Sequence, residues 1–317
     1  MDSDRFFSLI SQDIDEMVAA LPAQDMEWRQ LSRGRFHGQL KFAQFDAIEL
    51  FYLSWNQAMQ IRGSLPPGTV GFGMEISSQG RSIWRGLEYD NRDVLINSDQ
   101  EVDLKIPAGY EMFAVRLKRD LLLEHADLQQ RHLHPADLEK SLVRANPAAL
   151  NAIKAYLQSS LDMLERVPAD RNPCSDAQSI TQDVVSLLIT MLLSAEDSAT
   201  QPLRVLQRIR LIKQLEQHML AHINQTLTID HLCAVAGISE RSLNNYFHDL
   251  LDMSPMAYFK ALRLNRVRSA LKLANPTIDK VNLIANQWGF QHMGYFSVDY
   301  KVMFGESPSE TLWRSTQ

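Results

Sequence analysis

The C-terminal third of the chain carries a cluster of side chains suited to reading the edges of nucleic acid bases. Their spacing places them on or beside the outward face of one helix that begins near residue 240. An arginine fits O6 and N7 of guanine, and an asparagine fits N6 and N7 of adenine. The sequence therefore predicts DNA contacts from these side chains: Arg241, Ser242, Asn244, Asn245 and His248.

The elements that must position this cluster form a predicted helix–turn–helix unit over residues 229–250. Gly237 supplies the left-handed residue that ends the first helix, and Ser239 is a good N-cap for the second. The second helix of such a unit enters the major groove of DNA. Apolar residues at helical spacing mark the buried faces of both helices: Ile229, Leu232, Cys233, Ala236, Leu243 and Phe247.

A second unit is predicted over residues 281–304. Its turn glycine is Gly289, and it ends in Ser307-Pro308 as the first ends in Ser254-Pro255. Glycine and proline are 18 residues apart in the first unit and 19 in the second, so the repeat is imperfect. Leu283, Ile284 and Ala285 take the places of the apolar and small residues of the first unit. Its predicted DNA-contacting residues are His292, Met293, Tyr295 and Ser297.

A long helix is predicted between the units, over residues 255–273. A rigid connector would hold two recognition helices about one turn of DNA apart, roughly 34 Å. Arg263 and Arg266 are predicted to contact phosphates. They belong to a larger basic set whose members could instead form a solvated face or pair with acids: Lys260, Arg263, Arg266, Arg268 and Lys272.

These motifs resemble the DNA-binding domain of the AraC/XylS family of bacterial transcription regulators over residues 205–313. The resemblance implies seven helices and two recognition helices in successive major grooves. It also places Arg241, Asn244 and Asn245 at base-contacting positions. The matching motifs are Leu232-Cys-x-x-Ala-Gly-Ile-Ser239, Ser254-Pro-x-x-Tyr-x-x-x-Leu-Arg-Leu264 with Arg268, Ile284-Ala285 with Gly289-Phe290, and Phe304-Gly-x-Ser-Pro308.

The second unit departs from the family pattern. Val298 stands where family members commonly have arginine, and Asp299 follows it. A negative side chain near phosphate weakens DNA binding. The sequence therefore predicts an asymmetric reader, in which the first unit carries most of the specificity.

Length and charge divide the chain in two. A chain of 317 residues predicts two domains. Residues 203–317 hold 13 Lys and Arg against 9 Asp and Glu, whereas residues 1–202 hold 19 against 29, so only the C-terminal part is basic. We expect a sensing and dimerisation domain over 1–195, a linker over 196–204 and a DNA-binding domain over 205–317.

The region from residue 36 to residue 117 predicts short strands separated by turn signals, which is typical of a small barrel or jelly roll. It resembles the cupin-like sensor domain of AraC-family regulators, so the expected fold class is α+β. The predicted strands are 40–45, 48–55, 59–61, 70–76, 82–87, 93–96, 102–106 and 112–117.

A barrel interior could hold an unidentified small-molecule effector. Trp55, Phe72 and Trp84 are the predicted lining, although for any single one of them ordinary core packing is the favoured alternative. A domain that binds a protein partner in place of a metabolite remains an alternative.

Metal binding and catalysis are not expected. His132, His134 and Glu139 have a metal-like spacing, but Pro135 interrupts the strand that such a site needs. We therefore predict no cofactor, no metal and no catalytic residue. A cupin-type enzyme with a nucleic-acid module is the remaining alternative.

Helices are predicted over 135–143, 147–167 and 176–195. An apolar stripe on the second of them would suit a homodimer interface, or would pack on the barrel. The stripe consists of Leu150, Ile153, Leu157, Leu161 and Leu164.

The expected setting is the cytoplasm. No apolar run reaches the length of a membrane span, the N-terminus lacks the basic start of a signal peptide, and Cys174 and Cys233 have no paired spacing. The sequence thus predicts an effector-responsive transcription regulator, most simply a homodimeric activator. Its expected partners are double-stranded promoter DNA and RNA polymerase, with no membrane.

Overall fold

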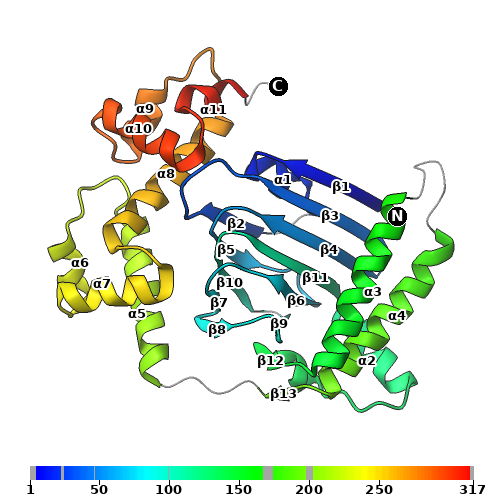
Figure 1. Cartoon of the computed structure of the whole chain (residues 1–317). Helices are drawn as coiled ribbons and strands as arrows, with labels where there is room; N and C mark the ends of the chain where they lie inside the picture. The colour runs from blue at the N-terminus through cyan, green and yellow to red at the C-terminus, as the bar shows by residue number, and fades with distance from the viewer. Residues whose placement is uncertain are drawn as a thin grey trace. The chain divides into compact units, whose positions relative to one another are not determined.

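The computed structural model forms two compact units, each described separately below (Figure 1). One unit comprises Met1–Trp28 and His37–Thr200, and the other comprises Arg29–Phe36 and Gln201–Gln317. The chain therefore passes from one unit to the other three times. The residues whose structure is described are 5–22, 25–45, 47–98, 100–166, 174–197 and 203–314.

The first unit is built on two antiparallel sheets. The predicted barrel is not closed, because the strands divide between these sheets and each sheet keeps its own edges. In spatial order the larger sheet is β1 (Arg5–Ser11), β3 (Gly38–Phe45), β4 (Ile48–Trp55), β11 (Tyr110–Lys118), β6 (Thr69–Ser77), β9 (Asp93–Ser98), β12 (Leu142–Arg144) and β13 (Glu196–Asp197). The smaller sheet is β2 (Asp25–Gln30), β5 (Met59–Ser64), β10 (Glu101–Ile106), β7 (Ser82–Trp84) and β8 (Leu87–Tyr89).

The larger sheet separates two interiors, because side chains alternate between its faces. Along β11, Phe113 and Leu117 enter a hydrophobic cluster with the helices, while Met112 and Ala114 line a cavity on the other face. The same alternation holds on β6, where the Phe72 ring joins the helix-side cluster.

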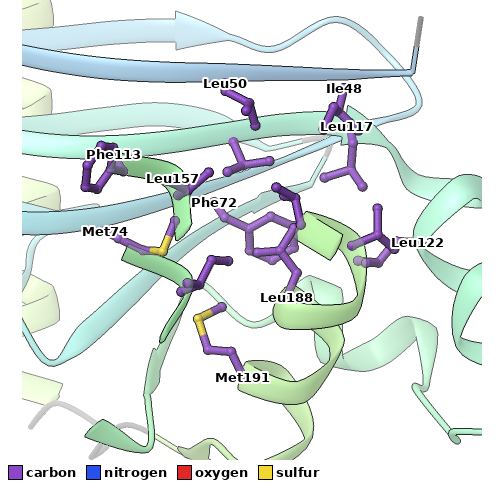
Figure 2. Close-up of a cluster of buried hydrophobic side chains, with 14 of the residues drawn as sticks. Ile48, Leu50, Phe72, Met74, Phe113, Leu117, Leu122, Leu157, Leu188 and Met191 are labelled. Atoms are coloured by element: carbon purple, nitrogen blue, oxygen red, sulfur yellow. The ribbon is translucent and has the colours of Figure 1, made fainter. Parts of the chain in front are cut away.

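Helices cover one face of this sheet. Figure 2 shows Leu157 and Leu188, from two neighbouring helices, in one cluster with Phe72 and Leu117 from the strands. The helices of this unit are α1 (Ile14–Ala20), α2 (Arg119–Leu128), α3 (Pro147–Arg166) and α4 (Cys174–Leu193), with a 3-10 turn, η1 (Pro135–Glu139).

The apolar stripe of α3 does not serve as the predicted homodimer interface. All five of its leucines and isoleucines are at most 3% exposed and belong to the core cluster against the sheet. The stripe therefore packs within its own unit, which was the alternative reading of the pattern.

Most predicted strands and helices of this unit are present, with ends that shift by a few residues. The predicted strand 82–87 is instead two short strands, β7 and β8. The predicted helix 135–143 is instead the 3-10 turn η1 followed by strand β12 (Leu142–Arg144). Strands β1 and β2 and helices α1 and α2 were not predicted. The predicted linker 196–204 begins with strand β13, and residues 198–202 lie outside the described residues.

Apart from the segment Arg29–Phe36, the described part of the second compact unit is helical, with no strand among residues 203–314. The central helix α8 contacts α5, α7, α9, α10 and α11, so it joins the two halves of the unit. Within the described residues 203–314, the seven helices are α5 (Leu203–Ala221), α6 (Ile229–Ala236), α7 (Glu240–Leu251), α8 (Pro255–Leu273), α9 (Val281–Gln287), α10 (Met293–Phe304) and α11 (Pro308–Arg314). Among the described residues of the chain, no helix combines the length and the apolar composition needed to cross a membrane.

The segment Arg29–Phe36 is hydrogen-bonded into this helical unit. The backbone N–H of Gln30 donates to the Asn265 side chain at 3.0 Å, and the Asn265 amide donates back to the Gln30 carbonyl at 2.9 Å. The Gln30 side chain donates to the carbonyl of Met303 at 2.6 Å, and the Gly34 N–H donates to that of Val302 at 3.0 Å. The segment thus binds both α8 and α10.

Candidate nucleic-acid interface and cavity

The first helix–turn–helix unit has the capping predicted from its sequence. Thr228 caps α6 by accepting a hydrogen bond from the His231 N–H at 3.2 Å, and Gly237 ends the helix at φ 65°. Ser239 caps α7 by accepting from the Ser242 N–H at 3.3 Å. The turn is three residues long. The end of α6 before it and the start of α7 after it both have capping hydrogen bonds to their backbone groups.

Helix α7 presents a polar outer face above a fully apolar inner one. Leu243 and Phe247 are completely buried. Arg241, Asn245 and His248 are exposed and stand at i, i+4 and i+7, which places them on one face. Within the described part of the chain, no hydrogen bond or ion pair engages these three side chains, so they are open to a partner.

The other two predicted residues of this helix are already engaged. Asn244 is half-buried and donates from Nδ2 to the Glu240 carbonyl at 3.1 Å. The Ser242 hydroxyl accepts from that of Ser239 at 3.1 Å. Their base contacts stay a prediction, and each would require exchange of a local bond.

Helix α5 braces the flank of α7. The Arg208 guanidinium lies 4.6 Å from the centre of the Tyr246 ring and 3.4 Å from the Asp249 carboxylate. Tyr246 and Asp249 each directly follow a residue of the exposed face in the sequence. Arg208 therefore contacts α7 beside that face and does not cover it.

The second helix–turn–helix unit is packed less tightly than the first. Helices α9 and α10 are separated by five residues, and His292, the N-cap of α10, makes no capping hydrogen bond with its side chain. Leu283, which the sequence pattern places among the buried apolar positions, is 56% exposed, whereas Ile284 and Ala285 are buried. The imperfect repeat is thus a longer turn and a looser entry to the second helix.

The outer face of α10 is polar at its start and apolar further along. His292, Tyr295 and Ser297 are exposed, while Met293 packs against the core of this half. Val298 is 64% exposed. Val298 therefore presents an apolar side chain where the family resemblance implies a base or phosphate contact.

Asp299 is not a free negative charge. The Lys260 ammonium of α8 lies 2.9 Å from its carboxylate. The prediction that Asp299 opposes DNA therefore needs a correction, because the pair is close to neutral as long as Lys260 is present. Sequence reasoning placed Lys260 in the basic set but did not find this pair.

The predicted phosphate contacts on α8 have different surroundings. Arg263 donates to the backbone carbonyls of Ile223 and Gln225, and its guanidinium lies 4.1 Å from the centre of the Phe259 ring. Desolvation by burial lowers the pKa of Arg263 below its usual 12.5. A phosphate contact from Arg263 stays a prediction, but its visible role is to hold backbone within the domain. Arg266 is half-buried.

Arg268, from the same basic set, is a core residue. It pairs with Glu306, and both side chains are 6% exposed. Thr311 donates to the same carboxylate at 2.7 Å and accepts from the Tyr300 hydroxyl at 2.8 Å. Arg268 thereby connects α8 to α10 and α11. For this residue, the alternative that the basic side chains pair with acids is the one found.

The connector α8 packs on both recognition helices. Tyr258 meets Phe247 of α7 edge to face, with ring centres 5.8 Å apart. Leu271 shares a buried cluster with Ile284 and Phe296 of the second helix–turn–helix unit. One helix therefore packs on both helix–turn–helix units. That it holds the two recognition helices rigidly one turn of DNA apart stays a prediction.

In the first unit of the chain, a cavity of about 130 Å³ is lined by residues from both sheets. Trp55 and Trp84, two of the predicted lining residues, line it. Their contact with an effector stays a prediction. Phe72 borders it too, but the ring of Phe72 belongs to the helix-side cluster. Gly71 and Gly73 of β6 form part of the wall. An added Cβ at Gly73 would lie 3.1 Å from Met112, so the glycines help to keep this space open.

Sequence reasoning missed three polar lining residues: Trp28, Asn97 and Arg116. Trp28 lies on β2, a strand whose pattern was not recognised. Asn97 directly follows the predicted strand 93–96, and Arg116 lies within the predicted strand 112–117. Inward alternation along those strands was the signal that could have found them.

The histidines with metal-like spacing have another surrounding. The His134 N–H donates to the Asp137 carboxylate at 3.1 Å at the start of η1. Among the described residues, no group of three or more His, Cys, Asp or Glu side chains is arranged to hold a metal ion.

Two sequence profiles match the chain. The AraC-binding-like domain matches residues 17–193, which is more than half of the chain, and the helix-turn-helix domain matches residues 232–314. Over 102 residues the chain is 37% identical to the probable thc operon regulatory protein of Rhodococcus erythropolis, which covers 32% of this chain and 31% of that protein. It is 22% identical over 285 residues to the XylDLEGF operon transcriptional activator of Pseudomonas putida, covering 88% and 85%.

Solved structures are also similar. The AraC-like transcriptional activator CuxR superposes with a TM-score of 0.45 at 14% identity, over 82% of this chain and 94% of that chain. ToxT from Vibrio cholerae gives a TM-score of 0.32 at 12% identity, over 92% and 98%.

Proposed function

The chain belongs to the AraC/XylS family of transcriptional regulators, and we propose that it activates transcription from promoters that it binds through α7 and α10. The observation that carries this proposal is the open face of α7. Arg241, Asn245 and His248 are exposed and share one face of a helix capped at its N-terminus. That is the geometry needed for direct readout in a major groove.

The two helices have different roles in this proposal. Helix α7 reads bases, with Arg241 suited to guanine and Asn245 to adenine. Helix α10 positions the protein on the next major groove through His292, Tyr295 and Ser297, and contributes less sequence information. The rigid packing of α8 on both helices supports binding of two adjacent grooves.

The compact unit that contains the two sheets, Met1–Trp28 with His37–Thr200, acts as the sensor. A small molecule in the cavity would favour the promoter-competent state by binding it more tightly than the alternative state. We propose that the active form is a homodimer that recruits RNA polymerase in the cytoplasm. Because the stripe of α3 is buried within its own unit, the proposed dimer would use another surface.

The test is footprinting of the purified chain on genomic DNA, followed by transcription from the bound promoters in vitro. We expect protection of two adjacent major grooves on one side of the duplex, with a stronger base preference in one of them. Protection without any sequence preference, or no protection at all, would reject the proposal. Lower transcription on binding would make the protein a repressor.

A further inference from the structure

The larger sheet has one long open edge. Strand β1 lies at its end, paired with β3 on one side and with no strand of the described residues on the other (Figure 1). Such an edge presents backbone N–H and C=O groups that another strand can bind. The other end strands offer less: β13 and β8 have two and three residues, and β2 ends in Gln30, which is hydrogen-bonded to Asn265.

Strand β1 lacks the features that usually protect an edge from pairing. Seven consecutive residues pair with β3 without a shift, so no bulge bends the strand. The strand contains neither proline nor lysine, and its Ile10 side chain is 64% exposed. Helices α1 and α3 each contact both β1 and β3, so they lie over the sheet and not beyond its edge.

Side chains of β1 alternate between the two faces of the sheet. Phe6 packs against the cluster on the helix side. The Phe7 ring lies 5.2 Å from that of Phe42, which in turn contacts Phe51 at the cavity, so Phe7 is on the opposite face. The helix-side residues are therefore Phe6, Ser8 and Ile10, and the cavity-side residues are Arg5, Phe7, Leu9 and Ser11.

The sequence of β1 is complementary to itself. If two copies pair in antiparallel fashion about a two-fold axis at Ser8, all seven residues find a partner. Phe6 then faces Ile10 of the partner subunit, and Phe7 faces Leu9 of the partner subunit, so apolar side chains meet on both faces. Moving the axis by one residue would leave two residues of each strand unpaired. The full pairing supplies roughly six to eight backbone hydrogen bonds.

The charges at the ends of β1 are complementary in the same register. Arg5 is exposed, and its guanidinium lies 5.0 Å from the centre of the Phe7 ring. It would face Ser11 of the partner subunit. The Ser11 hydroxyl donates to the carboxylate of Glu16, which is exposed. Arg5 would thus meet Glu16 of the partner subunit, once at each end of the junction.

This ion pair forms only between copies. Within one chain, six residues of extended strand separate Arg5 from Ser11, which is about 20 Å. Among the described residues, no ion pair engages Arg5 or Glu16. Both charges are therefore open to a second copy.

One group of charges opposes the pairing. Glu165 of α3 accepts a hydrogen bond from Ser8, so two such carboxylates would approach each other across the axis. The Lys41 ammonium lies 2.7 Å from Glu165 and 2.9 Å from Asp162, so it offsets half of the negative charge that each copy brings. Salt screens the remainder, since both carboxylates are partly exposed.

We propose that this chain dimerises by antiparallel pairing of β1 with β1 of a second copy. The two larger sheets then form one continuous sheet, and an Arg5–Glu16 pair lies at each end of the junction. This inference rests on the proposed function, for which it names the surface that joins the two subunits.

Charge reversal on the full chain tests the pair, with the dimer dissociation constant measured by sedimentation equilibrium. Arg5→Glu should weaken the dimer about tenfold or more, because two carboxylates would then meet, and Glu16→Arg should do the same with two cations. The double variant Arg5→Glu, Glu16→Arg should return to within about threefold of the wild type. Lys118→Glu, exposed at the end of β11, is the matched control and should leave the dimer unchanged.

Two further sets of variants test the edge and its register. Ile10→Lys should weaken the dimer about tenfold or more, whereas Leu128→Lys, 81% exposed on α2, should not. In a chain with Cys174→Ser and Cys233→Ser, Ser8→Cys should form an intersubunit disulfide under mild oxidation. Ile10→Cys should do so much more slowly, because the two copies of position 10 are offset by four residues, about 13 Å. Circular dichroism checks that each variant is folded.

The outcomes separate this inference from the proposed function. A chain that stays monomeric, or a dimer that neither Arg5→Glu nor Ile10→Lys weakens, would overturn the edge pairing. Failure of the double variant to recover, or faster disulfide formation at position 10 than at position 8, would overturn the register. If specific DNA is still protected in any of these cases, the regulator assignment stands. If the dimer behaves as expected but no specific DNA is protected, the pairing stands and the proposed function fails.

Discussion

Arg29 and Glu216 form a buried ion pair with 2.5 Å between Nη1 and Oε1, although 187 residues separate them in the chain. Arg29 is 5% exposed and Glu216 is fully buried. The pair ties the segment Arg29–Phe36 to α5 of the helical unit. Removing one partner of such a pair takes the nearest opposite charge away from a charge that stays buried.

We therefore expect Arg29→Met to lower the free energy of unfolding of the helical unit by about 3–5 kcal/mol. The double variant Arg29→Met, Glu216→Leu should recover most of this loss, because no charge then remains buried. Urea unfolding followed by far-UV circular dichroism measures both. A double variant as unstable as the single one would show that the pair itself, and not the orphaned charge, carries the energy.

The open face of α7 makes Arg241 the most informative single residue for DNA binding. Arg241→Ala should weaken binding to the specific operator by about 1–3 kcal/mol and relax the preference at one base pair. Binding to random DNA should change much less. Competition binding with an operator library measures the preference, and Arg204→Ala, also exposed, is the matched control. Unchanged preference in Arg241→Ala would remove this residue from the readout.

The Lys260–Asp299 pair predicts that the effect of a substitution at Lys260 of α8 on DNA affinity depends on the residue at position 299 of α10. Lys260→Ala alone leaves the Asp299 carboxylate uncompensated beside the second recognition surface, so DNA binding should weaken. Adding Asp299→Asn should restore a large part of the affinity, although the lysine is still absent. A fluorescence anisotropy titration of the two single variants and the double variant gives the coupling. Independent effects of the two substitutions would mean that Lys260 contacts DNA directly.

A substitution at Val298 should increase the affinity for DNA. It is 64% exposed on α10, so Val298→Arg adds a positive charge without disturbing the core. Affinity for DNA should rise, and the slope of log K against log salt should steepen by about one contact. Val302→Arg, one turn further along and 45% exposed, is the control and should change the slope less. Equal slopes for wild type and Val298→Arg would place this face of α10 away from the phosphates.

The helical unit should lose stability in mild acid because of His218. Desolvation lowers the pKa of His218 below its usual 6.5, and the neighbouring His222 and His231 lower it further. Their rings lie 4.2 and 5.1 Å from it. A histidine with a lowered pKa takes up its proton more readily when unfolded, so stability is lost as the pH falls from 6.5 through the folded pKa.

His218→Gln should flatten that dependence, whereas His132→Gln, on the surface of the other unit, should not. Thermal unfolding between pH 7.5 and about 5 measures the difference. A pH profile identical to that of the wild type in His218→Gln would assign the loss to other groups.

Local signals in the sequence predicted the parts of the DNA-binding surface that are locally determined. Gly237 and Ser239 are found where turn and cap chemistry require them, and α3 begins at the predicted proline, Pro147. Period and capping act within a few residues, so one sequence is enough to detect them. The closed barrel was wrong because strand lengths do not reveal which strands share a sheet.

Pairings between distant residues could not be predicted. Periodicity showed that α3 buries one face, but not whether a sheet or a second subunit covers it. Nothing near Arg29 indicates a partner on α5, and nothing near Asp299 indicates Lys260. The cavity-lining residues Trp28, Trp55 and Asn97 come from β2, β4 and β9, and the alignment of these strands depends on the whole fold.

The place of Arg29–Phe36 also has a consequence for synthesis. These residues leave the ribosome early, but α5, α8 and α10, which they bind, are translated last. Folding during synthesis proceeds from the N-terminus. The segment must therefore stay unsatisfied while the remainder of its own unit is still being made, and a C-terminal fragment starting at residue 205 would need it supplied as a separate peptide.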